Sequence, residues 1–90
     1  MISKISGVVW DTGDGYVVIR AGGVGYQVYV PSDLLEQFRK VEQPVELFTH
    51  FHLRENRMAL YGFLTKEKRS LFELLLDISG VGPTVALSLL

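Results

Sequence analysis

The chain has 90 residues, ten of them acidic and nine basic, and a formal net charge of −1 at pH 7. Hydrophobic residues make up 48% of it, which supports a folded core, and the absence of cysteine excludes disulfides and thiolate metal sites. It contains no apolar run of about 18 residues and opens with no signal-peptide pattern. We therefore expect a cytoplasmic protein without a membrane span.

Strand and turn patterns fill the first third of the chain. Residues 2–10, 16–20 and 24–30 predict three strands from β-branched runs and period-two alternation. Residues 10–15 predict a turn rich in glycine and aspartate. The glycine-rich run at 22–25 is a tight turn rather than a dinucleotide-binding loop, because a strand pattern and not a helix follows it.

A short helix and a long strand are predicted next. Residues 33–38 favour a helix, with Asp33 as its cap and Glu36 three residues later. Residues 45–53 are the clearest strand of the chain, because apolar residues alternate along it. One face of this strand carries Val45, Leu47, Thr49, Phe51 and Leu53, and the opposite face carries Glu46, Phe48, His50, His52 and Arg54.

The last strand of the series follows a charged turn at residues 54–57 and covers residues 58–63. Five short strands with one small helix between the third and the fourth fit a Greek-key barrel of the oligonucleotide/oligosaccharide-binding (OB) type. A fragment of a β-sandwich is the alternative. The predicted class is therefore mainly β with a helical C-terminal part.

The hydrophobic period changes after residue 63. Thr65 is a plausible helix cap, and apolar residues then recur at helical spacing up to Ile78. Glycines interrupt this helix, and Pro83 suits the first turn of a second one. We expect one domain at 1–63, the first helical hairpin of a second domain at 64–90, and a natural chain that continues past Leu90, since the last helix has neither a cap nor a packing partner.

The connection between the two helices is the first candidate site. It reads Ser79-Gly80-Val81-Gly82-Pro83-Thr84. A helix N-terminus offers unpaired N–H groups, and glycines let a phosphate come close to them, so this hairpin could hold a DNA backbone phosphate without reading bases. Its candidate residues are Ser79, Gly80, Val81, Gly82 and Thr84. A glycine-rich connector without a ligand explains the local pattern equally well.

The other candidates are weaker when taken alone. The turn Arg54-Glu55-Asn56-Arg57 reads as a solvated charged turn, with no second group to form an acid/base pair. His50 and His52 have a spacing that two metal ligands can use, but no third ligand is near in sequence, so a surface or interface role is favoured. Aromatic residues could stack bases on a barrel face, but core and subunit contacts are favoured for them. They are Trp10, Tyr16, Tyr26, Tyr29, Phe48 and Phe51.

Several of these segments, taken in order and spacing, resemble the RuvA family, and the resemblance covers all ninety residues. The segments that carry the resemblance are Met1-Ile2 before Gly7, Gly22-Gly23-Val24-Gly25-Tyr26, Thr49-His50-Phe51, Arg54-Glu55, Leu60-Tyr61-Gly62-Phe63, Leu71-Phe72 and Ser79-Gly80-Val81-Gly82-Pro83.

The resemblance implies a barrel, a middle domain with two helix-hairpin-helix motifs and a C-terminal domain that contacts the motor ATPase RuvB. It also implies fourfold tetramers on four-way (Holliday) junctions, and a RuvC-type resolvase as a further candidate partner. The family's acidic pin would fall on Glu55 and Asn56, the second of which is not acidic here. The family's basic residue after the proline is replaced here by Thr84.

The expected function is therefore structure-selective binding of junction DNA in branch migration, recombination, DNA repair and the SOS response. The chain would be a non-catalytic subunit without cofactor or metal. The alternative is a generic OB module that binds single-stranded nucleic acid. The net charge of −1 argues against DNA binding unless the charges are segregated by face, the rest of the natural chain is more basic, or binding uses neutral backbone donors.

Overall fold

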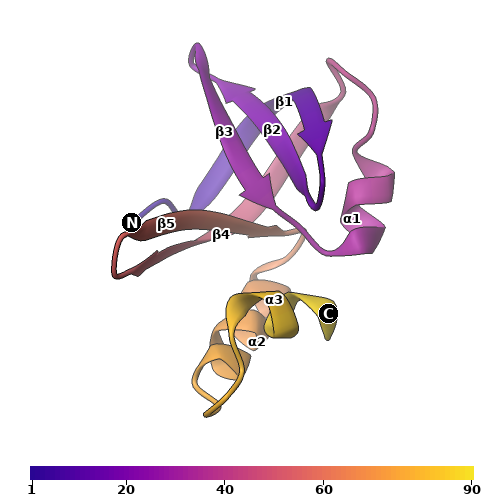
Figure 1. Cartoon of the computed structure of the whole chain (residues 1–90). Coiled ribbons are helices and arrows are strands. Elements are labelled where there is room, and N and C mark those ends of the chain that lie inside the picture. The colour runs from indigo at the N-terminus through magenta and orange to yellow at the C-terminus, as the bar shows by residue number, and fades with distance from the viewer.

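The computed structural model describes all residues 1–90 and shows a five-stranded barrel with two helices packed below it (Figure 1). The barrel closes in the order β1-β2-β3-β5-β4, with antiparallel neighbours except for the parallel pair β3 and β5. The predicted barrel with a helical C-terminal part is thus confirmed. The elements are β1 (Lys4–Gly13), β2 (Tyr16–Ala21), β3 (Val24–Tyr29), α1 (Ser32–Gln37), β4 (Pro44–Arg54), β5 (Arg57–Phe63), α2 (Lys66–Leu76) and α3 (Pro83–Ser88).

The barrel interior holds one apolar core. The alternation predicted for β4 is confirmed where the strand crosses the barrel, because Val45, Leu47 and Thr49 are buried. At its far end, Leu53 is 65% exposed, since β4 and β5 extend beyond the barrel as a free ribbon (Figure 1). The core cluster consists of Ile5, Val9, Val17, Ile19, Val28, Val30, Leu34, Phe38, Val45, Leu47 and Leu60.

Two strand positions accept only glycine for lack of space. A Cβ on Gly7 would lie 2.1 Å from the carbonyl oxygen of Arg20, and one on Gly62 would lie 2.7 Å from Cγ1 of Val28 and 2.9 Å from Cδ1 of Leu47. All three distances are shorter than any ordinary van der Waals contact of a Cβ. These glycines let neighbouring strands and core side chains approach closely enough to close a small barrel.

The first strand is longer than predicted. Residues 11–13 were expected in a turn but continue β1, and only Asp14 and Gly15 form the turn. The pairing with β2 shifts between Val9 and Asp11, which marks a bulge at Trp10. A bulge adds one residue and bends the strand without ending it, and the local sequence gives no sign of this.

The start of α1 also differs from the prediction. The helix begins at Ser32, Pro31 precedes it, and no side chain caps it. Asp33 therefore already lies in the first turn and cannot form the expected capping box. Glu36 pairs instead with Arg39, at 3.0 Å between Oε2 and Nη1.

The helices α2 and α3 pack on the outer surface of β4 and β5 around a second, smaller cluster. Its buried members are Phe63, Phe72 and Ala86. Thr65 caps α2 as predicted, because its hydroxyl accepts a hydrogen bond from the Lys68 N–H at 3.1 Å. Pro83 lies in the first turn of α3, also as predicted.

No helix of the chain is long and apolar enough to cross a membrane.

Candidate nucleic-acid interface

The tip of the β4–β5 ribbon is a two-residue turn with a strained backbone. Glu55 has a φ of +53°, a left-handed conformation that hairpin turns usually reserve for glycine or asparagine. Its carboxylate takes part in no ion pair, although Arg54 and Arg57 flank the turn. Glu55 and Asn56 are both exposed. The ribbon therefore presents an unneutralised carboxylate at its tip, in a position where a carboxylate residue is conformationally unfavourable.

The connection between α2 and α3 is a glycine hairpin. Gly80 has a φ of +85°, and the Val81 N–H donates to the Ile78 carbonyl at 3.1 Å, which closes the turn. Val81 packs against the cluster around Phe72, as expected for the residue that fixes such a hairpin. Ser79, Gly80 and Thr84 are exposed. The first N–H groups of α3, including that of Thr84, have no acceptor within the chain.

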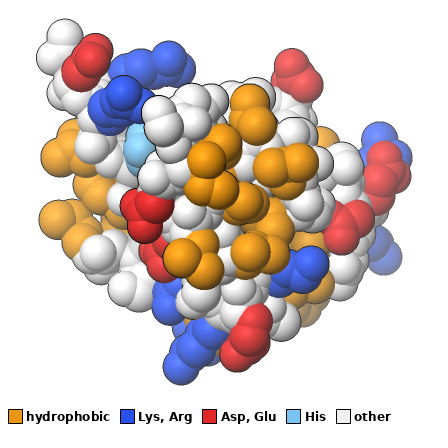
Figure 2. Space-filling view, turned by 90° about the horizontal axis from the view of Figure 1, so that it is seen from below, with side chains coloured by type: hydrophobic (Ala, Val, Ile, Leu, Met, Phe, Trp, Pro, Cys, Tyr) orange, Lys and Arg blue, Asp and Glu red, His pale blue; other side chains and the backbone are white.

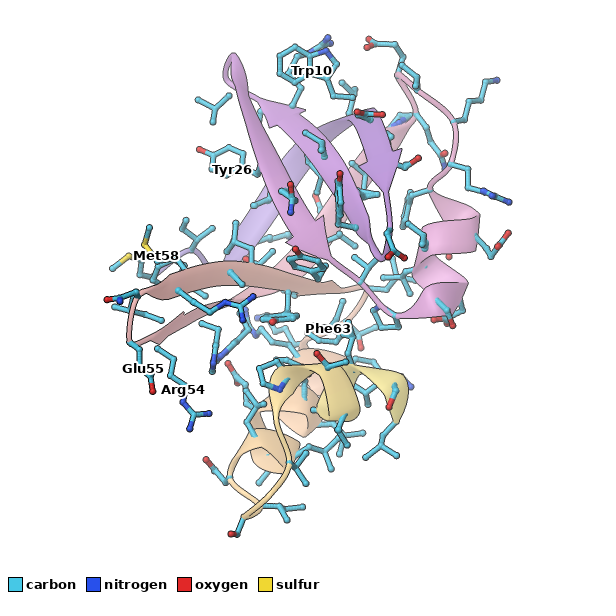
Figure 3. The ribbon with its side chains drawn as sticks, in the orientation of Figure 1. Trp10, Tyr26, Arg54, Glu55, Met58 and Phe63 are labelled. Carbon is cyan, nitrogen blue, oxygen red and sulfur yellow. The ribbon has the colours of Figure 1, made fainter.

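The turn and the hairpin lie on the same side of the molecule. Figure 3 shows the side chains of Arg54 and Glu55 pointing from the ribbon tip toward the side occupied by the helical pair, and Met58 pointing the opposite way. One groove is lined by residues from both segments: Arg54, Glu55 and Arg57 from the turn, and Pro83 and Thr84 from the start of α3. Of the candidate residues, only Glu55 and Thr84 line this groove, which does not include Ser79, Gly80, Val81, Gly82 or Asn56.

A half-buried pair joins the helices to the barrel. Nδ1 of His50 on β4 lies 2.8 Å from Oε2 of Glu73 on α2, and the His50 ring packs edge-on against Phe72 at 5.6 Å between centroids. The sequence prediction missed this pair, because the carboxylate comes from a residue 23 positions away. No group of three or more side chains of the metal-binding types lies close enough together to hold a metal ion.

Aromatic rings form a row on the outside of the barrel. The row runs from Tyr16 to Tyr29 and Tyr61, with centroid separations of 5.9 Å and 5.7 Å, and continues to His52 at 6.2 Å from Tyr61. Burial raises the pKa of Tyr61 above its ordinary value, and the neighbouring Tyr29 adds to this effect. Burial lowers the pKa of His52, with smaller contributions from His50 and Arg54. All four rings are partly exposed, and Tyr29, Tyr61 and His52 also line the groove.

The helical pair exposes many apolar side chains. Figure 2 shows hydrophobic side chains gathered over the middle of the face seen from below, with charged groups around them. The exposed large apolar residues of this part of the chain are Leu64, Leu71, Leu74, Ile78, Val85 and Leu89. An apolar patch of this kind marks a contact surface rather than a solvated one.

Comparison with known proteins assigns the chain to a family. Residues 1–62 match the family model described as RuvA N terminal domain. A Herpetosiphon aurantiacus protein is 46% identical over all 90 residues, and one from Dehalococcoides mccartyi is 41% identical over the same span. Both are named Holliday junction branch migration complex subunit RuvA, and the chain spans 46% of the length of each. With a closed five-stranded barrel over the matched residues, the chain belongs to the RuvA N-terminal domain family.

Proposed function

We propose that this chain is a non-catalytic DNA-binding module that binds four-way junctions as part of a branch migration complex. The observation that carries the proposal is one groove that is lined by Arg54, Glu55 and Arg57 of the turn and by Pro83 and Thr84 at the start of α3. The relatives are named as subunits of such a complex, which makes junction DNA the natural ligand for this surface.

The β4–β5 turn would supply selectivity. A carboxylate on a projecting tip repels phosphate, so it penalises any DNA whose backbone must cross that point. The centre of a four-way junction is open, whereas a continuous duplex has backbone there. Glu55 holds a strained φ of +53° without an ion pair, which is the kind of local cost that functional positions tolerate. We assign the acidic pin to Glu55, with Asn56 as its uncharged neighbour.

The hairpin would supply affinity without sequence preference. Its glycines leave the backbone accessible, because nothing lies within 4 Å of a Cβ built on Gly80 or Gly82. A phosphate oxygen could therefore approach the free N–H groups near Thr84, as at other helix N-termini that follow glycines. Backbone contacts of this type position DNA but do not read bases. Residues 64–90 would accordingly act as the first hairpin of a separate DNA-binding domain, after a barrel domain at 1–63.

Self-association is the second part of the proposal. Leu53 and Met58 on the ribbon are 65% and 72% exposed, and apolar side chains so exposed usually become buried in an assembly. A fourfold tetramer with the pins at its centre would place one Glu55 beside each arm of a junction. RuvB would then be the motor that acts on the bound DNA in the cytoplasm, and a RuvC-type resolvase would be a further partner.

The alternative function is a general single-strand binder, and the aromatic row of Tyr16, Tyr29, Tyr61 and His52 favours it. Three of these rings, Tyr29, Tyr61 and His52, line the groove, where bases of a single strand could stack on them. A gel-shift titration at matched salt separates the two functions. We expect tighter binding to a four-way junction than to a duplex of the same arm sequence or to a single strand. A preference for the single strand would overturn the junction proposal.

A further inference from the structure

Several basic side chains form no ion pair, and most of them lie on α2 or at the Arg54–Arg57 turn. Arg20 and Arg39 are each held by a glutamate, at 3.1 Å and 3.0 Å. In contrast, Lys66 and Arg69, in the first two turns of α2, take part in no ion pair. The other cluster of basic side chains is the Arg54–Arg57 turn. Positive charge is therefore locally clustered on the surface although the net charge of the chain is −1.

The cations of α2 meet a third cation over one aromatic ring. Nζ of Lys4 lies 4.9 Å from the centroid of the Phe48 ring, Nζ of Lys66 lies 5.9 Å from it, and Cζ of Arg69 lies 5.7 Å from it. Arg69 is also fixed by a hydrogen bond of 2.7 Å from its Nη1 to the carbonyl oxygen of Ser3. We call these four residues, Lys4, Phe48, Lys66 and Arg69, the Phe48 patch.

The patch carries an excess of positive charge. Glu46 is the acidic residue that forms an ion pair with the patch: its Oε1 lies 3.3 Å from Nζ of Lys4, and both side chains are about half exposed, at 58% and 47%. Lys66 and Arg69 form no ion pair, so two of the three cations are not neutralised in this way. Each cation–π contact at an exposed site contributes only about 0.5–1 kcal/mol, so the ring offsets little of the repulsion among the three cations. A bound anion would relieve that repulsion.

We propose that the Phe48 patch binds a backbone phosphate of nucleic acid, as a contact separate from the turn and the hairpin. The fixed guanidinium of Arg69 offers further N–H groups of a planar fork that suits phosphate oxygens, and the two lysines add mobile point charges. The inference rests on the proposed function in one respect, namely that nucleic acid is the polyanion that reaches this chain. Lys66 begins α2 and the hairpin follows its end, about 16 Å along the helix. The two ends of α2 would therefore contact different phosphates.

The test is a salt titration of DNA binding with charge-matched variants of the full chain. Lys66→Gln with Arg69→Gln removes two positive charges from the patch. Arg39→Gln with Lys40→Gln removes the same two residue types from the loop that follows α1, which contains no candidate site residue. Each phosphate contact contributes about 0.9 to the slope of log affinity against log salt. We expect the patch variant to lose about 1 to 2 from this slope on both junction and duplex, and the control variant to keep it.

A second patch variant guards against a structural effect of losing Arg69. Lys4→Gln with Lys66→Gln leaves the bond from Arg69 to Ser3 intact and should still lower the slope by about 1. Equal slopes for parent, patch and control variants would overturn the inference, and so would a patch variant that changes the sedimentation behaviour, because the surface would then be a subunit contact. A parent chain that binds duplex and junction equally, with a lower slope in the patch variants, would refute the junction proposal and leave this inference standing. A parent that binds no DNA would refute both.

Discussion

The ribbon tip and the helical hairpin expose different chemical groups to solvent. At the tip, charged side chains project from a strained turn, with Glu55 at a φ of +53°. At the hairpin, glycines remove side chains, and the backbone itself is exposed around Gly80 and Gly82. The difference teaches that selectivity and affinity can be separated. The tip can change which DNA is accepted, and the hairpin can change how tightly any DNA is held.

The largest effect on stability is expected from a variant that disrupts the packing of α2 on the barrel, because this packing holds the hairpin and the ribbon together. Phe72 is fully buried, with ring centroids 4.9 Å from Phe63 and 5.1 Å from Tyr61. Phe72→Ala should lower the free energy of unfolding of the helical part by about 3–5 kcal/mol, because it leaves a cavity between helix and barrel. Chemical denaturation followed by circular dichroism measures the loss. Leu71→Ala is the control, since Leu71 is 43% exposed and should cost much less. Equal losses for both variants would contradict this packing.

Some of this architecture was predictable from local patterns, and some was not. Alternation along β4 predicted which residues share a face, and Thr65 predicted the start of α2. Each of these two signals is contained within a few neighbouring residues of the chain. The bulge at Trp10 and the His50–Glu73 pair were missed, since a bulge depends on the neighbouring strand and the pair depends on how α2 docks. The cations of the Phe48 patch likewise come from segments that are far apart in the sequence. For the candidate site, the residue types could be predicted, but their arrangement around one groove could not.

An effect of intermediate size, on DNA binding, is expected from a substitution in the hairpin. Gly82 is the N-cap of α3, has a φ of −92° and leaves open space for a Cβ, so Gly82→Ala should cost less than about 1 kcal/mol of stability, the preference of an N-cap for glycine over alanine. If a phosphate approaches there, the added methyl group should weaken binding to junction and duplex by the same factor, because the contact is to the backbone. Titration of both DNAs beside a thermal melt checks this. Unchanged binding, or a loss confined to one DNA, would show that the hairpin holds no phosphate.

Gly80→Ala tests the second glycine of the hairpin, whose backbone is left-handed. Its φ of +85° is unfavourable for alanine, so we expect a stability loss of about 1–2 kcal/mol in addition to weaker binding. The two glycines thus separate a conformational requirement from a steric one. Equal stability losses in both variants would contradict the assignment of the left-handed position to Gly80.

The smallest effect concerns pH. Burial lowers the pKa of His52 in the folded chain below its ordinary value of 6.5. The unfolded chain then binds a proton more readily, so the stability that His52 contributes is present above about pH 6.5 and is lost as the pH falls through the folded-state pKa. Melting temperatures should therefore decline less between about pH 7 and pH 5 in His52→Gln than in the parent. An identical decline in both would mean that His52 is not desolvated.

Selective junction binding depends most directly on the negative charge of Glu55, which is proposed to repel DNA backbone. The measurement is the ratio of junction affinity to duplex affinity at one salt concentration, for the parent, Glu55→Gln and Asn56→Asp, in the full chain. We predict that Glu55→Gln tightens duplex binding more than junction binding, so that the ratio falls, and that Asn56→Asp raises it by adding a second negative charge at the same tip. An unchanged ratio in both variants is what a merely solvated turn would give, since isolated exposed charges contribute little, and it would contradict the pin assignment.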